Sequence, residues 1–415
     1  MAAVRTLTVE TEPGAVGFDA ARLARLDDHF RRYVDDGRLP GWLVAVTRHG
    51  RLIHLSACGR RDLEADLPVE HDTIWRIYSM TKPITAVTAL SLWEEGAFEL
   101  NDPVHRYVPA FREARVWRAG TAARPATTPM AEPMRIWHLF THTSGLTYGF
   151  MHAHPVDTLY RQAGFEWGVP DGLDLAGVCE RLASMPLLFQ PGREWSYGMS
   201  TDVLGMVVEA AAGVPFADAV HERVLDPLGM TETTWHVEDD HAARLAALYT
   251  PQPGSGTAVR LDSLGAAARH RPTATMGGSG LCSTAPDYLR FAEMLRRRGE
   301  LEGVRILAPS TVDRMASNHL PGNADLSEFG RPLFSETAYD GVGYGLGVSV
   351  LVDSIKARIS GSVGDHGWGG AASTSYWVDP VLDLTVLFLI QLLPSDSWPL
   401  RSQLRQLVHA ALTGA

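Results

Sequence analysis

The chain has 415 residues, 45% of them hydrophobic, which is enough to bury a large core and to form two or three domain-sized units. Its 48 acidic and 37 basic residues leave a net charge of -11, which argues against nucleic acid or an anionic membrane as a partner. Residues 1–19 lack an apolar segment after a basic start, and no apolar run reaches the roughly 18 residues that span a bilayer. We therefore expect a cytoplasmic protein.

The first hundred residues predict a helix, a β-hairpin and a second helix. Residues 19–36 have an amphipathic helical pattern, and the apolar runs 43–47 and 52–57 flank a turn that contains Gly50. Residues 79–95 are mostly apolar on all sides, which is typical of a buried helix.

The pattern of predicted elements changes in the middle of the chain. From 101 to 271, helical segments alternate with Pro/Gly loops and no convincing paired strands occur, which indicates an inserted helical domain. The last part returns to mixed signals, which predict a helix at 285–298, strands at 344–352, 374–378 and 384–390, and a closing helix at 400–412.

The expected fold class is α+β. The simplest closure joins the N- and C-terminal strands in one antiparallel sheet flanked by the terminal helices. Residues 1–100 and 272–415 would form this discontinuous domain and residues 101–271 the mainly helical one. The cleft between two such domains is where we expect the active site.

Cysteine and histidine give no sign of a metal site. Cys58, Cys179 and Cys282 lie far apart among apolar or small residues, so we expect buried free thiols. Four histidines within 138–154 lack zincin spacing with glutamate, so we predict no metal. No Gly-x-Ser-x-Gly elbow is present, which argues against an α/β-hydrolase.

A serine and a lysine open the buried helix. Ser79 and Lys82 are three residues apart, so their side chains lie on one helical face and can touch. The chain has 35 arginines and only two lysines, Lys82 and Lys356, yet one lysine stands at this apolar position. A buried lysine can become neutral and accept the serine proton, which an arginine cannot do. The alternative interpretation is a solvated first-turn lysine.

The Ser-x-x-Lys motif resembles that of the serine β-lactamase and penicillin-binding-protein superfamily. The chain looks most like class C β-lactamases and the related family VIII carboxylesterases. The resemblance rests on a series of further signatures in the family's order, namely Leu100-Asn101-Asp102-Pro103-Val104, Leu139-Phe140-Thr141-His142-Thr143-Ser144-Gly145-Leu146, Gln190-Pro191-Gly192, Pro227-Leu228-Gly229-Met230, Gly277-Gly278-Ser279-Gly280-Leu281, Ser283-Thr284-Ala285-Pro286-Asp287 and Trp377-Val378-Asp379-Pro380.

The resemblance also implies a catalytic tyrosine. Tyr197 matches the tyrosine of the family's Tyr-x-Asn motif and would form an acid-base pair with Lys82, although a half-buried core phenol is the alternative interpretation. Met199 replaces the asparagine with which the lactamases hold an amide.

The family's Lys-Thr-Gly strand aligns with Trp368-Gly369-Gly370. Trp368 cannot attract a carboxylate as the lysine does, but it can pack against an apolar acyl or alcohol group. We expect Gly369 and Gly370 to let the substrate approach the strand closely. His366 is a candidate for the rim of the site, with a turn position as the favoured alternative.

An oxyanion hole is implied at the backbone N–H groups of Ser79 and Ala371. We accordingly expect a cofactor-independent carboxylesterase for small neutral or apolar esters, with no nucleic-acid or membrane partner. An acyltransferase would use the same groups. A weak β-lactamase or D-amino-acid peptidase, and an inactive binding protein of the same fold, remain alternatives, and the oligomeric state is not predicted.

Overall fold

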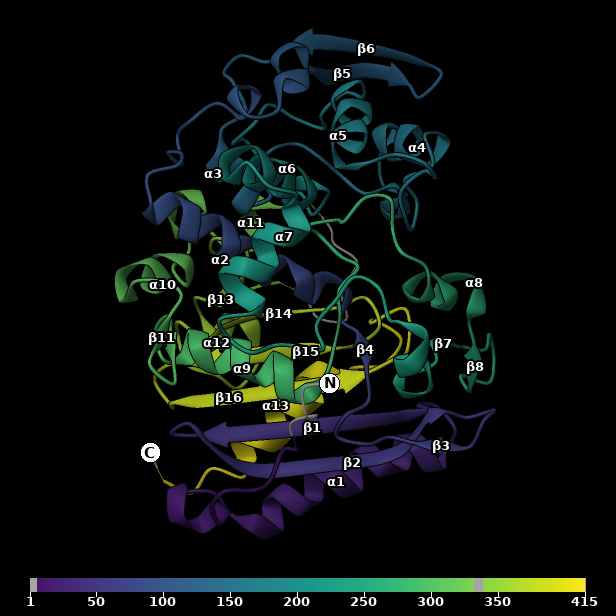
Figure 1. Cartoon of the computed structure of the whole chain (residues 1–415), viewed down its shortest axis with the longest axis vertical. Coiled ribbons are helices and arrows are strands. Elements are labelled where there is room, and N and C mark those ends of the chain that lie inside the picture. The colour runs from purple at the N-terminus through teal and green to yellow at the C-terminus, as the bar shows by residue number, and fades with distance from the viewer. Residues whose placement is uncertain (1–5, 332–338, 415) are drawn as a thin grey trace.

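The computed structural model describes residues 6–331 and 339–414, and an antiparallel sheet of eight strands lies in the lower half of the view in Figure 1. The N-terminal hairpin pairs directly with the last strand of the chain, so that Ala45 faces Leu387 in register. This confirms the expected closure of N- and C-terminal strands into one sheet. In spatial order the strands are β12 (Val342–Tyr344), β13 (Ser349–Leu351), β14 (His366–Gly369), β15 (Ser375–Asp379), β16 (Leu384–Ile390), β1 (Gly41–Arg48), β2 (Arg51–Asp62) and β3 (Leu67–Pro68).

Helices cover both faces of the sheet, so β16 is buried along its whole length. Val386 and Phe388 pack in one apolar cluster with Phe30 of a terminal helix, whereas Leu387 and Leu389 face a larger cluster on the other side. The terminal helices are α1 (Ala20–Asp35) and α13 (Leu400–Ala410), and the helices of the other face include α2 (Thr81–Glu94) and α9 (Ala285–Arg296). The predicted helices and the apolar strand are thus confirmed.

A group of helices lies beyond the α2 face of the sheet, at the upper end of the molecule in Figure 1. These helices come from the middle of the chain, where the sequence predicted helical segments. They are α3 (Ile136–Phe140), α4 (Pro155–Gln162), α5 (Leu175–Ala183), α6 (Ser200–Ala212) and α7 (Phe216–Val220). Four short helices lie elsewhere, namely α8 (Asp262–Gly265), α10 (Pro309–Met315), α11 (Leu326–Phe329) and α12 (Ser354–Ala357).

The expectation that residues 101–271 contain no paired strands is wrong. β5 (Arg115–Thr121) and β6 (Arg124–Pro129) form a hairpin, and β7 (Tyr249–Pro251) pairs with β8 (Ala258–Arg260). Most side chains of these strands face solvent, so they lack the apolar alternation that marks a half-buried strand. Two more short pairs are β4 (Trp75–Arg76) with β9 (Cys282–Ser283) and β10 (Glu300–Leu301) with β11 (Val304–Arg305).

Residues 344–352 form no single strand, in contrast to the prediction. The backbone turns after Tyr344, where Gly345 N donates to Val348 O at 2.8 Å and Gly347 adopts a φ of +89°. The apolar run therefore divides between β12 and β13, which pair with each other. The turn is hard to foresee because Leu346 and Val348, which lie within it, are as apolar and as buried as the residues of the strands.

Two of the three cysteines are fully buried free thiols, as expected. Cys179 lies in α5 and Cys282 in β9, and burial raises the pKa of each thiol. Cys58 of β2 is also free but only partly buried, with Arg31 of α1 beside it. The expectation of burial is therefore corrected for Cys58.

Within 6–331 and 339–414, no individual helix combines the length and the apolar character needed to cross a bilayer. One helix pair, Ser200–Ala212 with Phe216–Leu225, meets the length and composition criteria only when taken together. These two helices meet at a bend of 84°.

Candidate active site

Ser79 lies in a tight 3-10 turn, Tyr78–Met80, directly before α2. Tyr78 has a φ of +45°, in the left-handed region that residues other than glycine seldom adopt. The hydroxyl of Tyr288 donates to Met80 O at 2.9 Å and so holds the end of the turn. Constrained backbone of this kind is often found at functional sites, where surrounding packing maintains it.

Lys82 is fully buried one turn further along, as the sequence predicted. Its Nζ donates to Ser79 Oγ at 3.1 Å and to Gly278 O at 2.7 Å. Burial lowers the pKa of Lys82 to about 7, against the opposing charge of Asp202. The other lysine, Lys356, is a surface residue whose pKa is raised by two carboxylates. A neutral amine that can accept the serine proton is therefore accessible near neutral pH at Lys82.

Tyr197 lies beside both of these groups. It forms a hydrogen bond with Ser79, and the Lys82 Nζ is 4.6 Å from the centroid of its ring. Trp368 Nε1 donates to the Tyr197 hydroxyl oxygen at 3.2 Å. Burial raises the pKa of Tyr197, while the hydrogen bonds from Ser79 and Trp368 act in the opposite direction. The fold thus brings together Ser79, Lys82, Tyr197 and Trp368, which are up to 289 positions apart in sequence.

The two glycines after Trp368 lie in a closely packed turn. A Cβ on Gly370 would lie 2.5 Å from Ile77 O, and one on Gly369 would lie 2.5 Å from the Arg401 guanidinium carbon. On their Cβ side both glycines are therefore packed against protein atoms, while close approach of substrate to the backbone here stays a prediction. The close contact with Ile77 packs this turn, which continues into Ala371, against the residues that lead to Ser79.

The two remaining candidate binding residues, Met199 and His366, are both buried. Met199 is 5% exposed and precedes the first residue of α6, with its N–H directed at Thr147 O. His366 begins β14 and is also 5% exposed, and its Nδ1 lies 3.0 Å from Gly364 O. Because the His366 ring is buried and the residue lies in a strand, neither the rim position nor the turn position expected for it is correct.

An aromatic wall that the sequence analysis missed surrounds Tyr197. Ring centroids of His142, Tyr148 and Trp195 lie 4.9, 5.3 and 6.2 Å from that of Tyr197. Tyr148 also lies 5.4 Å from Lys82 Nζ. The sequence did offer a signal for two of these residues. His142 belongs to the signature 139–146, and Tyr148 lies two positions after the end of that signature.

The aromatic wall continues outward to the surface. Phe150 stacks on Tyr148 with centroids 4.8 Å apart, and Trp167 stacks on Phe150 at 4.6 Å. Trp167 is 42% exposed, so the stack connects the partly buried Tyr148, and through it the buried Tyr197, with solvent. Stacked rings of this kind offer a flat apolar surface.

A second missed residue is Asp202 in the first turn of α6. It is 2% exposed, and its Oδ1 accepts a hydrogen bond from Gly278 N at 2.7 Å. Burial raises the pKa of the Asp202 carboxyl to about 6, with the charge of Lys82 opposing this shift. An isolated Asp in an apolar helical pattern carries no sequence signal of its own.

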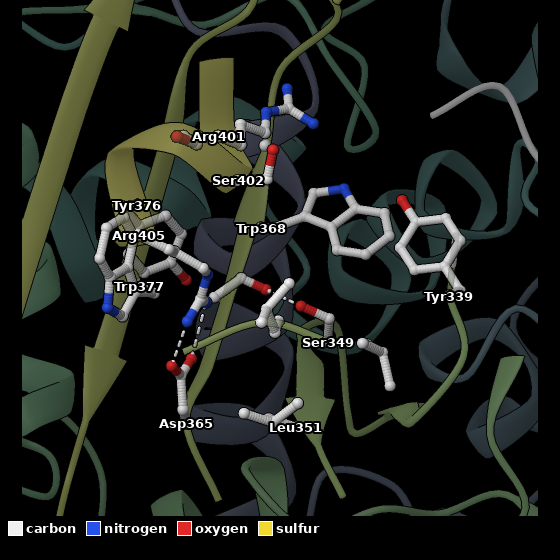
Figure 2. Close-up of a pocket in the computed structure, with 15 residues that line it drawn as sticks. Tyr339, Ser349, Leu351, Asp365, Trp368, Tyr376, Trp377, Arg401, Ser402 and Arg405 are labelled. Atoms are coloured by element: carbon white, nitrogen blue, oxygen red, sulfur yellow. Dashed lines mark hydrogen bonds and ion pairs between the residues drawn. The ribbon is translucent and has the colours of Figure 1, made fainter. Parts of the chain in front are cut away.

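Figure 2 shows a cavity of about 110 Å³ beside the site, between β13 to β15 and the first turns of α13. Trp368 borders the cavity, and its ring lies nearly parallel to that of Tyr339, at 13° and 6.5 Å. Further along, Arg405 pairs with Asp365 through two hydrogen bonds. Ser79 does not line this cavity, which adjoins the candidate site through Trp368 and Gly369.

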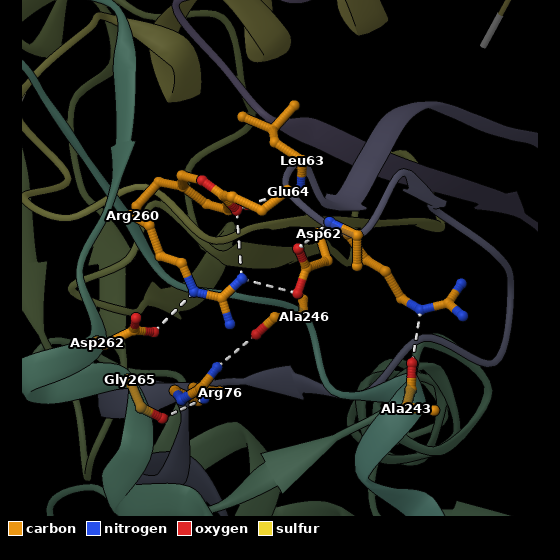
Figure 3. Close-up of polar contacts among 12 residues, drawn as sticks. Asp62, Leu63, Glu64, Arg76, Ala243, Ala246, Arg260, Asp262 and Gly265 are labelled. Carbon is orange, nitrogen blue, oxygen red and sulfur yellow. Dashed lines mark hydrogen bonds and ion pairs between the residues drawn. The ribbon is translucent and has the colours of Figure 1, made fainter.

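The strand that leads to the nucleophile is fixed by a buried arginine (Figure 3). Arg76 donates to Ala246 O at 2.5 Å and to Gly265 O, and so ties β4 to the segment that carries α8. In the same region Arg260 pairs with Asp62, at 2.9 Å, and with other carboxylates. These contacts hold the residues before Ser79 in place from outside the site.

No group of three or more His, Cys, Asp or Glu side chains suited to a metal ion occurs in the part of the chain that the structure describes. The donor set at the site consists of a hydroxyl, an amine and a phenol. This set is suited to moving a proton between oxygen and nitrogen atoms.

Comparisons with known proteins identify the family of the chain. A model of the family described as Beta-lactamase matches residues 26–410. Esterase EstB of Burkholderia gladioli is 34% identical over 420 residues, with 96% of this chain and 98% of EstB covered. Protein Rv1367c of Mycobacterium tuberculosis is 37% identical over 371 residues, with 88% and 89% covered.

A solved structure extends the comparison to the whole fold. EstCE1, described as a hydrolase with promiscuous acyltransferase activity, superposes with a TM-score of 0.79 at 28% identity, covering 94% of this chain and 98% of EstCE1. These matches agree with the resemblance inferred from the Ser-x-x-Lys motif and the later signatures. The chain therefore belongs to the beta-lactamase family, with esterases among its relatives.

Proposed function

We propose that the protein is a serine carboxylesterase that hydrolyses small neutral or apolar esters through an acyl-enzyme on Ser79. The observation that carries this proposal is the buried Lys82 amine, 3.1 Å from Ser79 Oγ, with a pKa lowered to about 7. Such an amine can take the serine proton at the moment of attack, which a protonated surface lysine cannot do.

In the acylation step, Ser79 Oγ attacks the ester carbonyl carbon and its proton passes to Lys82 Nζ. The N–H groups of Ser79 and Ala371 would stabilise the oxyanion that forms. When the bond to the alcohol oxygen breaks, Tyr197 donates its hydroxyl proton to that oxygen and recovers one from Lys82. The products of this step are the free alcohol and the acylated serine.

Deacylation uses the same groups in reverse. Water attacks the acyl carbonyl while Tyr197 and Lys82 accept its proton, and Ser79 leaves as the hydroxyl after protonation by the same pair. The carboxylic acid is released, and the route as written consumes only ester and water.

The surroundings of the nucleophile support an uncharged substrate. Trp368 stands where the β-lactam enzymes have a lysine, Met199 replaces an amide-binding asparagine, and Tyr148 adds an aromatic ring beside Lys82. An apolar surface of this kind favours neutral acyl and alcohol groups over the carboxylate that β-lactams and D-peptides carry.

The substrate class is tested by comparing kcat/KM for p-nitrophenyl butyrate with that for nitrocefin, with Ser79→Ala as the control. We expect ester turnover at least about a hundredfold more efficient, and loss of both activities in the variant. Equal efficiency with nitrocefin would replace the esterase by a β-lactamase, and turnover that survives Ser79→Ala would remove the proposed nucleophile. Absence of any Ser79-dependent turnover would favour an inactive binding protein.

An acyltransferase is the second candidate, because an alcohol can replace water in the deacylation step. The described activity of EstCE1 favours including it. With p-nitrophenyl butyrate as donor and a series of alcohols as acceptors, the ratio of new ester to butyrate measures the preference. Ester as the main product at millimolar alcohol would favour the transferase.

We also propose the division into a discontinuous domain, 1–100 with 272–415, and an inserted domain, 101–271. The supporting observation is that all strands of the eight-stranded sheet come from the first set of residues, whereas the helices α3 to α7 come from the second. Limited proteolysis that releases 101–271 as a stable fragment would agree with this division, and cleavage only at other positions would contradict it.

A further inference from the structure

Two glycines connect the helix of the nucleophile with α6. Thr85 Oγ1 of α2 donates to Gly277 O at 2.7 Å, and Lys82 Nζ donates to Gly278 O at the same distance. On the opposite side, Gly278 N donates to Asp202 Oδ1 at 2.7 Å. One peptide segment is therefore held between Lys82 and Asp202, with the carbonyl on the lysine and the N–H on the carboxylate.

This segment requires glycine for a physical reason. A Cβ on Gly278 would lie 2.6 Å from Asp202 Oδ2, and one on Gly277 would lie 2.4 Å from Thr201 O. Both distances are shorter than a side-chain carbon can tolerate. The absence of side chains thus allows the Asp202 carboxylate to approach the peptide that anchors Lys82.

Lys82 and Asp202 are surrounded by groups that are neutral when buried. Among the residues that the structure describes, the other titratable groups that interact with Lys82 or Asp202 are Tyr148, Tyr197 and His142, together with Cys179 of α5, and burial disfavours ionisation of all four. Lys82 and Asp202 each act electrostatically on the other. The carboxylate is therefore the principal negative charge that opposes the buried ammonium.

Resting on the proposed esterase mechanism, we propose that Asp202 is a positioning residue for Lys82. Its carboxylate accepts from Gly278 N and so holds the Gly278 carbonyl against the amine. Its negative charge also stabilises the protonated form of Lys82 within the buried site. Proton transfer through Lys82 needs both forms of the amine, because the group must first accept the serine proton and then return it. Asp202 does not touch the reacting atoms in this role.

The two contributions can be separated by two variants. Asp202→Asn keeps an oxygen that can accept from Gly278 N but removes the charge, so the protonation midpoint of Lys82 should fall by about one pH unit or more. Asp202→Glu keeps the charge but displaces the carboxylate by one methylene. It should leave the midpoint near its wild-type value while kcat falls roughly fivefold or more with KM nearly unchanged.

The measurement uses the rarity of lysine in this chain. Protein labelled with ¹³C at the lysine side chain has signals from only Lys82 and Lys356, and Lys356→Arg assigns them. Titration of the free enzyme then gives the Lys82 midpoint directly, without substrate or turnover. Asp379→Asn is the matched control. Asp379 is also fully buried, and its carboxylate accepts hydrogen bonds from the backbone N–H groups of Ser362, Val381 and Leu382, which lie outside the site.

A Lys82 midpoint that moves down in Asp202→Asn, stays in Asp202→Glu and stays in Asp379→Asn supports the proposal. A midpoint in Asp202→Asn equal to that of the wild type would overturn the electrostatic role, and an unchanged kcat in Asp202→Glu would overturn the positioning role. If Asp202→Asn does not fold, Asp202→Glu decides, since a lowered midpoint there contradicts the proposal as well. Because the titration needs no catalysis, failure of the esterase activity leaves its result readable.

Discussion

Trp368 donates its indole N–H to the hydroxyl oxygen of Tyr197 at 3.2 Å, and its ring lies 5.5 Å from the phenol ring. The residue that replaces the family's lysine is thus a neutral donor to the proposed catalytic tyrosine. It favours negative charge on that oxygen, yet it offers no cation to a substrate carboxylate.

Trp368→Phe should therefore lower kcat for p-nitrophenyl butyrate by roughly five- to a hundredfold, because a hydrogen bond worth about 1 to 3 kcal/mol is lost at a group that gains charge. KM should change little. Steady-state kinetics of this variant and of Trp377→Phe, a buried tryptophan on the opposite face of the sheet, checks the prediction. Equal kcat values for wild type and Trp368→Phe would show that the indole only packs.

The two lysines provide a matched pair for the proposed base. Lys82→Arg should lower kcat/KM about a thousandfold or more, because a guanidinium remains protonated and cannot accept the Ser79 proton. Lys356→Arg should retain nearly full activity, since its ion pairs at the surface survive the exchange. Near-normal rates in a folded Lys82→Arg protein would contradict the role of Lys82.

The pH dependence follows from the direction of the Lys82 shift. The pKa of the buried amine is lowered to about 7, and only the neutral amine accepts a proton. For a neutral ester, kcat/KM should thus rise as the pH rises through about 7 and level off above it. An acid limb with its midpoint near 10, the ordinary range of lysine, would be inconsistent with a desolvated base.

Gly370 offers a test of the turn that packs against the nucleophile segment. Gly370→Ala would place a methyl group 2.5 Å from Ile77 O, so we expect a loss of about 2 kcal/mol in the free energy of unfolding and at least tenfold lower activity. Gly168→Ala, where no atom lies within 4 Å of the added carbon, is the control. Denaturant unfolding and ester hydrolysis measure both effects, and wild-type behaviour of Gly370→Ala would refute the packing argument.

The stack from Tyr148 to Trp167 predicts how the length of the acyl group affects KM. Trp167→Ala should raise KM for p-nitrophenyl octanoate several-fold while leaving that for the acetate unchanged, because only the longer chain can cover the exposed ring. Kinetics across the acyl series checks this. Equal changes in KM for both esters would show that the stack lies outside the binding surface.

The central pair of the site was predictable because it depends on local spacing. Ser79 and Lys82 lie one helical turn apart, and the rarity of lysine in the chain drew attention to the second residue. The sheet was predictable for a similar reason, since the apolar runs near both ends of the chain have the composition of buried strands.

The parts that escaped prediction depend on tertiary contacts or on solvent. Asp202 gains its position only because Gly278 passes between α2 and α6, and no spacing in the sequence indicates that contact. The role of Gly369 and Gly370 likewise follows from Arg401 and Ile77, which are distant in sequence. The hairpin β5–β6 was missed because exposed strands need no apolar pattern.

The most direct test of the account is intact-protein mass spectrometry after brief exposure to p-nitrophenyl butyrate, with Ser79→Ala treated in parallel. We expect a transient butyryl adduct on the wild-type protein that maps to the peptide containing Ser79 and is absent from the variant. A slowed deacylation in Tyr197→Phe should increase its population. An adduct on another residue, or rapid ester turnover that persists in Ser79→Ala, would contradict the claim that Ser79 is the nucleophile.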